Sequence, residues 1–193
     1  MSLSLTKYKI LETMLLLDKP ERATHIAKEA GKEFPSVMMH IIGLTRMGYV
    51  SSPEKGFYAI TDRGKKALGI PDVNQENAKT ILAPMPQDKS FQFYAGIGKP
   101  LDLHASSLQD FRDTILKVNV DAIEFHKDRG DFEAWLKGFG DVELAKKVAL
   151  LKQKNMDAEE MRRRLHDFIE NRCMVLASKA GQMVPPESAT SGA

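Results

Sequence analysis

The sequence predicts a mainly α protein with two domains, an α+β domain with one hairpin followed by a helical bundle. Three observations predict this division. Over residues 1–69, apolar residues recur at spacings of three and four and then alternate across a short hairpin. Residues 70–89 are rich in proline and polar residues, as in a linker that could hold a short ordered piece at 78–82. Helical periodicity resumes over 90–181, and the polar segment 182–193 is expected to be a disordered tail.

Two helices are expected at the start of the first domain. The first is capped by Thr6 and runs to about Leu17, where the approach to Pro20 ends it. The second covers residues 23–30, and Gly31 can adopt the left-handed conformation that closes a helix.

A third helix is expected to begin near Pro35, which suits a first helical turn, and to run to about Met47. Val37, Ile41 and Leu44 form one apolar stripe along it. This stripe should pack on the first two helices.

A two-stranded hairpin and a short helix follow. Residues 49–51 and 57–60 are typical of paired strands, and a tight connection at 53–56 joins them. Thr61 is expected to cap a closing helix over 62–68.

This order of elements resembles the winged helix-turn-helix domains of archaeal and bacterial transcription regulators, of the broad MarR-like kind. The residues that carry the resemblance are IAKEAG at 26–31, PSVMMHIIGLTRMGYV at 35–50 and YAITDRGKKAL at 58–68, roughly a third of the chain. The resemblance implies that the third helix and the hairpin, or wing, bind double-stranded DNA.

With about 100° per residue, one side of the third helix faces away from the buried stripe. Together with nearby basic residues, this side defines the predicted DNA-binding surface: Lys28, Lys32, Pro35, Ser36, Met39, His40, Gly43, Arg46, Lys55 and Arg63. Base edges are read by hydrogen bonds, yet only Ser36 and Arg46, with His40 on the flank, can form them from this helix. Two interpretations stay open. The cations bind phosphates with little base reading, or the apolar side of the helix packs against protein.

Charge and composition agree with the first interpretation. Residues 1–70 hold 11 Lys+Arg against 7 Asp+Glu, whereas the whole chain has a net charge of only +2.

The single cysteine, Cys173, excludes an intramolecular disulfide and a cysteine-rich zinc site, and it fits a reducing cytoplasm. The apolar run near the N-terminus, Met14 to Leu17, is too short for a membrane span. We therefore expect a cytoplasmic protein that makes no membrane contact.

The second domain is expected to be helical. Residues 91–95 could form a strand or an extended segment, and Ser107 with Asp110 is spaced almost as a capping box for the helix that follows. Further helices are predicted over four segments: 121–127, 131–139, 142–152 and 157–176. Asp157 and Glu160 resemble a capping box for the last helix, whose apolar stripe could belong to the bundle or to a dimer seam.

A run of motifs in the second domain resembles an uncharacterised domain family of archaea and bacteria. The residues are Ser107-Leu108 with Phe111, Phe125-His126, Arg129 with Asp131-Phe132 and Trp135, and Gly140-Asp141 with Leu144-Ala145. The resemblance implies no established activity.

One interpretation of these motifs is structural. It places Phe125, Phe132 and Trp135 as core aromatics at a helix–helix corner. In this interpretation Asp131 caps the helix that carries Trp135. Arg129 then pairs with one of two neighbouring acids, Glu124 or Asp128.

Two other interpretations involve a ligand. A metal or acid–base site would use five polar residues: His104, Glu124, His126, Asp128 and Asp131. Their spacing matches no fixed ligand motif. Alternatively, a pocket near Trp135 senses a small molecule.

We therefore expect a DNA-binding transcriptional regulator. We also expect a homodimer, because winged-helix regulators usually bind two half-sites. The second domain would dimerise or sense a small-molecule or protein effector. No cofactor, metal or enzymatic activity is expected. The alternatives are a protein-interaction module that uses the apolar face of the third helix, and an enzyme built on the second domain.

Overall fold

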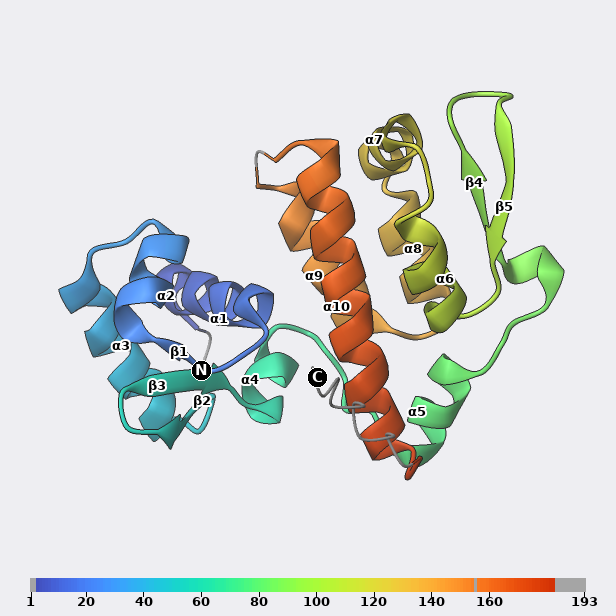
Figure 1. Ribbon diagram of the computed structural model, residues 1–193. Helices are drawn as coiled ribbons and strands as arrows, with labels where there is room; N and C mark the ends of the chain where they lie inside the picture. The colour runs from blue at the N-terminus through green and yellow to red at the C-terminus, as the bar shows by residue number, and fades with distance from the viewer. Residues whose placement is uncertain (1–2, 155, 183–193) are drawn as a thin grey trace, which may run out of the picture. The chain divides into compact units, whose positions relative to one another are not determined.

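The computed structural model describes residues 3–154 and 156–182 (Figure 1). The described chain is mainly helical and contains two small antiparallel sheets, one of three strands and one of two. The mainly α class predicted from the sequence is therefore confirmed. The tail expected over 182–193 lies outside the described residues except for Gln182.

The chain divides by contact into two compact units, which are described separately below. The first unit comprises residues 1–72 and 145–155, and the second comprises residues 73–144 and 156–193. No pattern in the sequence indicates that 145–155 groups with the N-terminal part. Periodicity reports that a helix has a buried face but not which partner covers it.

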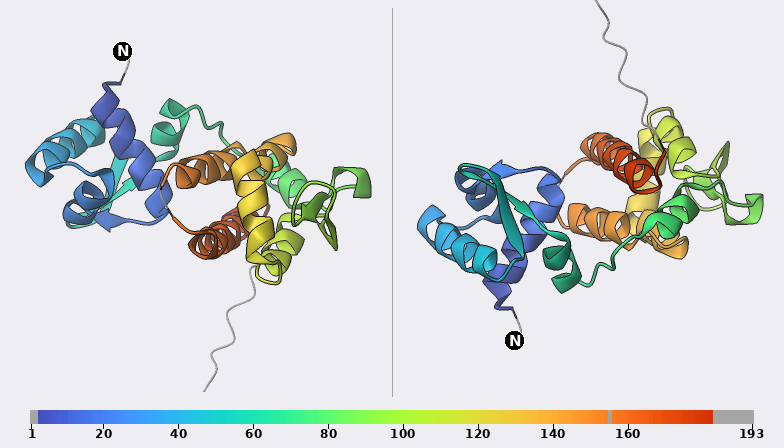
Figure 2. Two further views of the ribbon diagram at one scale, coloured as in Figure 1. Left: turned by 90° about the horizontal axis from the view of Figure 1, so that it is seen from above. Right: turned by 90° about the horizontal axis from the view of Figure 1, so that it is seen from below.

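Three helices form the core of the first unit, and Figure 2 shows them from two opposite directions. They are α1 (Leu5–Leu17), α2 (Ala23–Ala30) and α3 (Phe34–Arg46), and each contacts the other two. Their apolar stripes fill a common core, in which the fully buried side chains include Ile10, Leu11, Leu15, Ile26, Val37, Ile41 and Leu44. The predicted bounds of the three helices agree closely with these.

The start of α1 differs from the prediction. Ser4, rather than Thr6, caps the helix, because its hydroxyl accepts a hydrogen bond from the Lys7 backbone N–H at 3.4 Å. Thr6 lies inside the first turn. At the end of α2, Gly31 adopts the predicted left-handed conformation, with φ of 62°.

A three-stranded antiparallel sheet follows the helices in the first unit. Its strands lie in the order β1 (Glu21–Arg22), β3 (Phe57–Ile60) and β2 (Val50–Glu54). Strands β2 and β3 form the predicted hairpin, but β2 continues through Glu54, so the turn lies at Lys55 and Gly56. The connection predicted at 53–56 is therefore too long. Strand β1 was not predicted, because two residues are too few to show an alternating pattern.

Helix α4 (Asp62–Ala67) packs against this hairpin. Thr61 caps it as predicted: its hydroxyl accepts the Gly64 N–H at 3.1 Å and donates to the Gly48 carbonyl at 2.7 Å. Gly64 is buried at a close approach, since a Cβ atom there would lie 2.3 Å from the carbonyl oxygen of Tyr49. The site therefore has room only for glycine.

In the second unit a long helix, α10, contacts the shorter helices α5, α6 and α7, and a hairpin packs on α6 and α7. Its described elements are α5 (Gln75–Leu82), the 3-10 turn η1 (Gln87–Lys89), β4 (Phe91–Tyr94), β5 (Pro100–Ala105), α6 (Leu108–Ile115), α7 (Val120–Arg129), α8 (Asp131–Gly138) and α10 (Ala158–Lys179). Helix α9 (Val142–Lys152) begins in this unit and continues into residues that group with the first. The helices predicted after residue 120 are all present.

Residues 70–89, expected as a linker, hold more structure than the sequence suggested. Helix α5 buries Ala78, Ile81 and Leu82 and contacts α10. Prolines and polar residues around it hide this short apolar stripe, so that only a short ordered piece at 78–82 was foreseen.

The second unit is also not purely helical, which corrects the predicted helical bundle. The strand considered at 91–95 is present as β4, and its antiparallel partner β5 was not predicted. The inward-facing alternation of Leu101, Leu103 and Ala105 was the available signal. Pro100 and the charged or polar residues between them obscured it.

Two predicted helix caps in this unit are confirmed. The Ser107 hydroxyl accepts a hydrogen bond from the Asp110 N–H at 3.1 Å at the start of α6. The Asp157 carboxylate accepts one from the Glu160 N–H at 2.7 Å at the start of α10.

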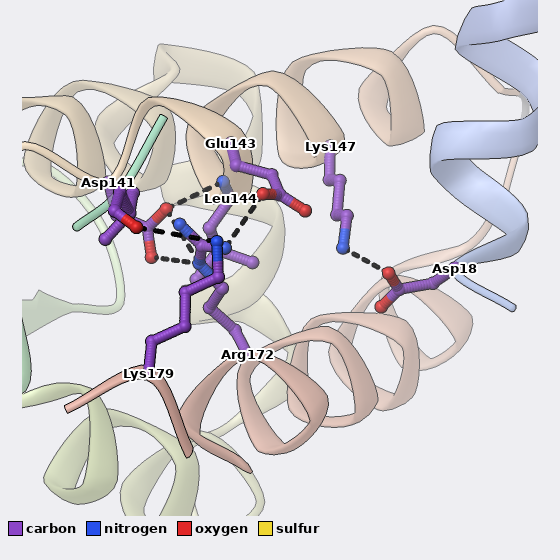
Figure 3. A network of polar contacts seen from close by, with 8 residues as sticks. Asp18, Asp141, Glu143, Leu144, Lys147, Arg172 and Lys179 are labelled. Atoms are coloured by element: carbon purple, nitrogen blue, oxygen red, sulfur yellow. Dashed lines mark hydrogen bonds and ion pairs between the residues drawn. The ribbon is translucent and has the colours of Figure 1, made fainter. Parts of the chain in front are cut away.

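A buried ionic cluster joins the start of α9 to α10 within the second unit (Figure 3). Arg172 Nε lies 2.9 Å from Asp141 Oδ2, and Arg172 Nη1 lies 2.8 Å from Glu143 Oε2. Asp141 also accepts the Leu144 N–H at 3.1 Å, which caps α9. All three charged side chains are buried, so the cluster serves packing and is closed to ligands.

Candidate functional sites

Helix α3 has one buried and one open side. Val37, Ile41 and Leu44 face the core and are completely buried. On the other side, Met39 is 63% exposed and Ile42 is 43% exposed. Large apolar side chains that share one helix face are typical of interaction surfaces, so this face is the first candidate site.

All ten residues predicted to contact DNA lie at the surface of the first unit, and none is buried. The exposed ones are Lys28, Lys32, Pro35, Met39, Arg46, Lys55 and Arg63. The partly exposed ones are Ser36, His40 and Gly43. They come from α2, the segment between α2 and α3, α3, the hairpin turn and α4, all of which belong to the first unit.

The start of α3, strand β1 and the hairpin turn border one shallow hollow of about 250 Å³. Its lining includes Arg22, Phe34, Met38, Gly56 and Tyr58. The turn that carries Lys55 therefore lies close to the start of α3. Arg22 was not predicted as a site residue, because it precedes α2 and only the sheet brings it here.

Two further cations flank the other part of α3. A Cβ atom on Gly43 would lie 3.9 Å from Nζ of Lys7, a residue of α1 that was not predicted. The Arg63 guanidinium lies 5.4 Å from the centre of the Tyr49 ring, beside the C-terminal end of α3. Its packing on the ring holds Arg63 at the surface, where no carboxylate of the described residues forms an ion pair with it.

Carboxylates of the first unit are largely occupied by other cations. The pairs are Glu12 with Lys146 at 3.1 Å, Glu21 with His25 at 3.0 Å, Glu29 with Lys154 at 2.7 Å, and Asp18 with Lys147. Over residues 3–154 and 156–182, by contrast, no ion pair engages four of the predicted site residues: Lys28, Lys32, Arg46 and Lys55. Their charges face solvent, partly offset by the exposed neighbours Glu33 and Glu54.

The second candidate site is an open pocket of about 500 Å³ in the second unit. It lies between β4, the turn after β4, α7 and α8. Four aromatic side chains line it, Phe91, Tyr94, Phe125 and Trp135. The core role expected for the aromatics is therefore right for Phe132, which is completely buried, but Phe125 and Trp135 are partly exposed pocket walls.

His126 is one of the polar side chains of the pocket wall and is only 3% exposed. Its Nε2 accepts the Tyr94 backbone N–H at 2.9 Å, so Nδ1 carries the proton and donates to Asp131 Oδ2 at 2.8 Å. Burial lowers the pKa of His126 below its ordinary value, although the hydrogen bond to Asp131 opposes this. The imidazole is therefore neutral and fully hydrogen-bonded.

Asp131 and Arg129 differ from their predicted roles. The residue at the N-cap of α8 is Gly130, and the Asp131 side chain makes no capping hydrogen bond. Instead, Asp131 Oδ2 accepts a second hydrogen bond, from Arg129 Nε at 3.1 Å. Arg129 thus pairs with Asp131 rather than with Glu124 or Asp128, whose carboxylates lie near Lys127.

The residues considered for a metal or acid–base site are not brought together. Only His126 and Asp131 are in contact, and His104 lies on β5 opposite Gln92. In the described part of the chain, no group of three or more His, Cys, Asp or Glu side chains could hold a metal ion.

Trp135 separates the aromatic pocket from a second hollow of about 510 Å³. Its indole N–H donates to the Lys89 carbonyl at 3.0 Å, and its ring stacks on Phe111 with centroids 5.1 Å apart. The second hollow is lined by the segment after α5 and by the end of α8, including Pro84, Met85 and Phe139. Trp135 is thus held in place between two cavities.

The second unit is a mainly α domain in which two helices and a hairpin border an open aromatic pocket. The chain belongs to the family of unknown function DUF5752, whose model matches residues 73–170. This range begins just before α5 and ends within α10, so it covers most of the second unit. No curated protein and no solved structure matches the chain. None of the described helices has the length and apolar character needed to cross a bilayer.

Proposed function

We propose that the protein binds double-stranded DNA through α3 and the β2–β3 hairpin of the first unit and acts as a transcriptional regulator. One observation carries this proposal: the cations around the open side of α3 lack carboxylate partners among the described residues, whereas most carboxylates of the same unit are paired. A surface with uncompensated cations attracts the phosphate backbone of nucleic acids.

The local geometry supports a winged helix-turn-helix interpretation of this unit. Helices α2 and α3 are joined by the short segment 31–33, which begins with a left-handed glycine, as in helix-turn-helix motifs. The hairpin that follows α3 supplies a wing with Lys55 at its turn. In such motifs the second helix enters the major groove.

The mechanism is occupancy of DNA without chemistry. Lysines and arginines around α3 contact phosphates, which position the protein but do not read sequence. From α3 itself, Ser36, His40 and Arg46 can form hydrogen bonds to base edges. Met39 and Ile42 can contact the methyl group of thymine. We therefore expect modest sequence discrimination and a large electrostatic contribution to affinity.

We further propose that the protein acts as a cytoplasmic homodimer, in which two winged helices bind two half-sites. The second unit would provide dimerisation or sensing of an effector. Burial raises the pKa of the Cys173 thiol to about 11, so this cysteine is a packing residue and not a redox group.

Fluorescence anisotropy of the full chain with random duplex DNA at roughly 50 and 200 mM salt tests the proposal. If Lys28, Lys32, Arg46, Lys55 and Arg63 each neutralise one phosphate, counterion release predicts roughly a 500-fold loss of affinity per protomer between these salt concentrations. Lys32→Glu or Lys55→Glu should weaken binding by about tenfold and reduce the salt dependence.

Lys117→Glu is the matched control, because Lys117 is also exposed, lies in the second unit and undergoes the same change of charge. Binding that is absent at 50 mM salt, or that Lys117→Glu weakens as much as Lys32→Glu, would exclude the proposed surface.

A specific observation favours a second candidate function, binding of protein by the apolar face of α3. Phe34, Met39 and Ile42 are all at least 43% exposed, which exceeds what a purely phosphate-binding surface needs. Apolar association depends little on salt, unlike DNA binding. If DNA binding is absent, sedimentation of the wild type and of Met39→Asp would show whether this face mediates self-association.

A further inference from the structure

We propose that the aromatic pocket of the second unit binds a planar aromatic compound that carries an acidic group, and that Arg129 contacts the acidic group. The proposal concerns β4, α7 and α8, and it does not depend on DNA binding by the first unit. The size of the cavity, the chemistry of its walls and the free edge of one guanidinium support it.

The cavity has the size and lining of a small-molecule site. Its volume of about 500 Å³ falls within the range of roughly 300–1,000 Å³ typical of ligand pockets. Phe91, Tyr94, Phe125 and Trp135 present ring faces and edges, with which a planar ring system can stack or make edge contacts. An aliphatic ligand would gain the same burial but not the ring-to-ring geometry.

Two side chains of the pocket wall, His126 and Trp135, already have hydrogen-bond partners within the protein. Both ring nitrogens of His126 have partners, Tyr94 and Asp131, and the Trp135 indole N–H is bonded to the Lys89 carbonyl. A ligand therefore meets no unsatisfied donor or acceptor from these two side chains. The part of the ligand that packs against these two side chains should accordingly be apolar, since a polar group there would lose its hydration without compensation.

Arg129 at the rim is held in place but keeps donors available. Its Nε donates to Asp131, and its guanidinium lies 5.2 Å from the centre of the Phe125 ring. Among the described residues, neither Nη nitrogen has a hydrogen-bond partner, and the side chain is 55% exposed. The two Nη groups form a planar fork that matches the oxygens of a carboxylate or sulfonate.

Asp131 does not cancel this preference for an acidic group. Its Oδ2 accepts hydrogen bonds from both His126 and Arg129, which fixes the carboxylate on the inner edge of the guanidinium. The outer edge, which carries the Nη groups, is therefore left for the ligand. The arrangement orients Arg129 before the ligand binds, so that little side-chain entropy is lost on binding.

Ile97 at the mouth of the pocket gives an independent indication that the ligand is apolar. It lies in the turn between β4 and β5, lines the cavity and is 87% exposed. An isoleucine this exposed gains free energy when a bound apolar ring covers it. A bound aromatic compound would place Ile97 against its outer face.

A matched pair of dyes tests the proposal with the full chain. 8-Anilinonaphthalene-1-sulfonate has an aromatic body and a sulfonate, whereas N-phenyl-1-naphthylamine has the same body without the charge. Trp135 is the single tryptophan of the chain and lines the pocket, so energy transfer from its fluorescence reports occupancy. We expect saturable binding of both dyes, and tighter binding of the sulfonate.

Arg129→Gln should weaken binding of the sulfonate dye by about tenfold or more and change binding of the neutral dye by less than about twofold. Ile97→Ser should weaken both dyes. Far-UV circular dichroism and the melting temperature would verify that each variant is folded, as the exposure of both side chains leads us to expect.

Ala83→Phe is the control for the second hollow, which Trp135 also borders and which Ala83 lines. This substitution should leave both dyes unaffected. The proposal is overturned if neither dye binds saturably, if folded Arg129→Gln weakens both dyes equally or neither, or if Ala83→Phe, rather than Ile97→Ser, removes binding.

Discussion

Charged side chains are used in opposite ways in the two units. Around α3 of the first unit, Lys28, Lys32 and Lys55 are exposed and have no ion pair among the described residues. In the second unit, Arg172 and Asp141 are buried and paired with good geometry. The exposed lysines can therefore contact an anionic partner. The charges of the buried pair are neutralised within the protein.

This difference teaches that the presence of a charge says little about its role until its partners are known. A buried pair contributes to stability mainly through the cost of breaking it, whereas an exposed cation contributes little to stability and much to the attraction of anions. Arg129 combines both, because its Nε is paired and its Nη groups are available. The same comparison yields three predictions on stability.

The largest effect is expected for the buried cluster. Arg172→Ala leaves the completely buried Asp141 carboxylate without its main cation, which should lower the free energy of unfolding by about 3–5 kcal/mol. Arg163→Ala is the control, because Arg163 is 63% exposed and pairs with Glu160 at the surface, and it should cost less than about 1 kcal/mol. Urea denaturation measures both. Similar costs for the two variants would contradict the distinction between buried and exposed ion pairs.

A smaller effect is expected where the first unit depends on close backbone packing and not on charge. Gly64→Ala forces a Cβ atom to within 2.3 Å of the Tyr49 carbonyl oxygen, so it should destabilise the protein by about 1–3 kcal/mol. Gly138→Ala is the control, since the added Cβ meets nothing within 4 Å and the residue lies in helix α8. Thermal unfolding should show a lower melting temperature for Gly64→Ala alone. An unchanged melting temperature would mean that α4 is not packed as described.

The smallest effect concerns His126 and pH. Above its ordinary pKa of 6.5, the imidazole is neutral in both folded and unfolded states. As the pH falls below 6.5, the unfolded state takes up a proton before the folded state, whose His126 pKa is lowered by burial. Stability attributable to His126 is therefore lost as the pH falls from about 6.5 toward the lower folded pKa.

His126→Gln removes this titration, so the loss of stability between pH 7 and 5 should be smaller in the variant than in the wild type. The comparison between the two proteins is needed because the chain has five histidines. Urea midpoints measured across this range would decide it. Parallel pH profiles for the two proteins would show that His126 is not buried in its neutral form.

Local structure was predictable from the sequence wherever neighbours along the chain supply the interaction. The three helices of the first unit, the left-handed Gly31 and the Thr61 cap all follow from periodicity and from side chains within four residues. One error arises over the same short range, where two hydroxyl acceptors compete to cap a helix. Ser4 and Thr6 are both able to cap α1, and only Ser4 does so.

The candidate sites were predictable only in part. The open side of α3 follows from helical geometry, and the ten predicted residues are all at the surface. Arg22 and Lys7 were missed because they reach that surface from β1 and α1. In the second unit, Trp135 was recognised as a position near a pocket, but the assignment of Asp131 as a cap was wrong. Its carboxylate instead accepts hydrogen bonds from both His126 and Arg129, which the turn at Gly130 brings within its reach.

The sequence by itself determined which segments are helical, which of their sides are apolar and where several of them begin and end, because these depend on interactions between residues a few positions apart. Tertiary structure alone decided three other features: the grouping of residues 145–155 with the N-terminal unit, the pairing of β4 with β5, and the aromatic pocket that this hairpin forms with α7 and α8. Tertiary structure likewise decided which basic side chains have no carboxylate partner among the described residues. Each of these depends on contacts between residues far apart in the chain, which local patterns do not encode.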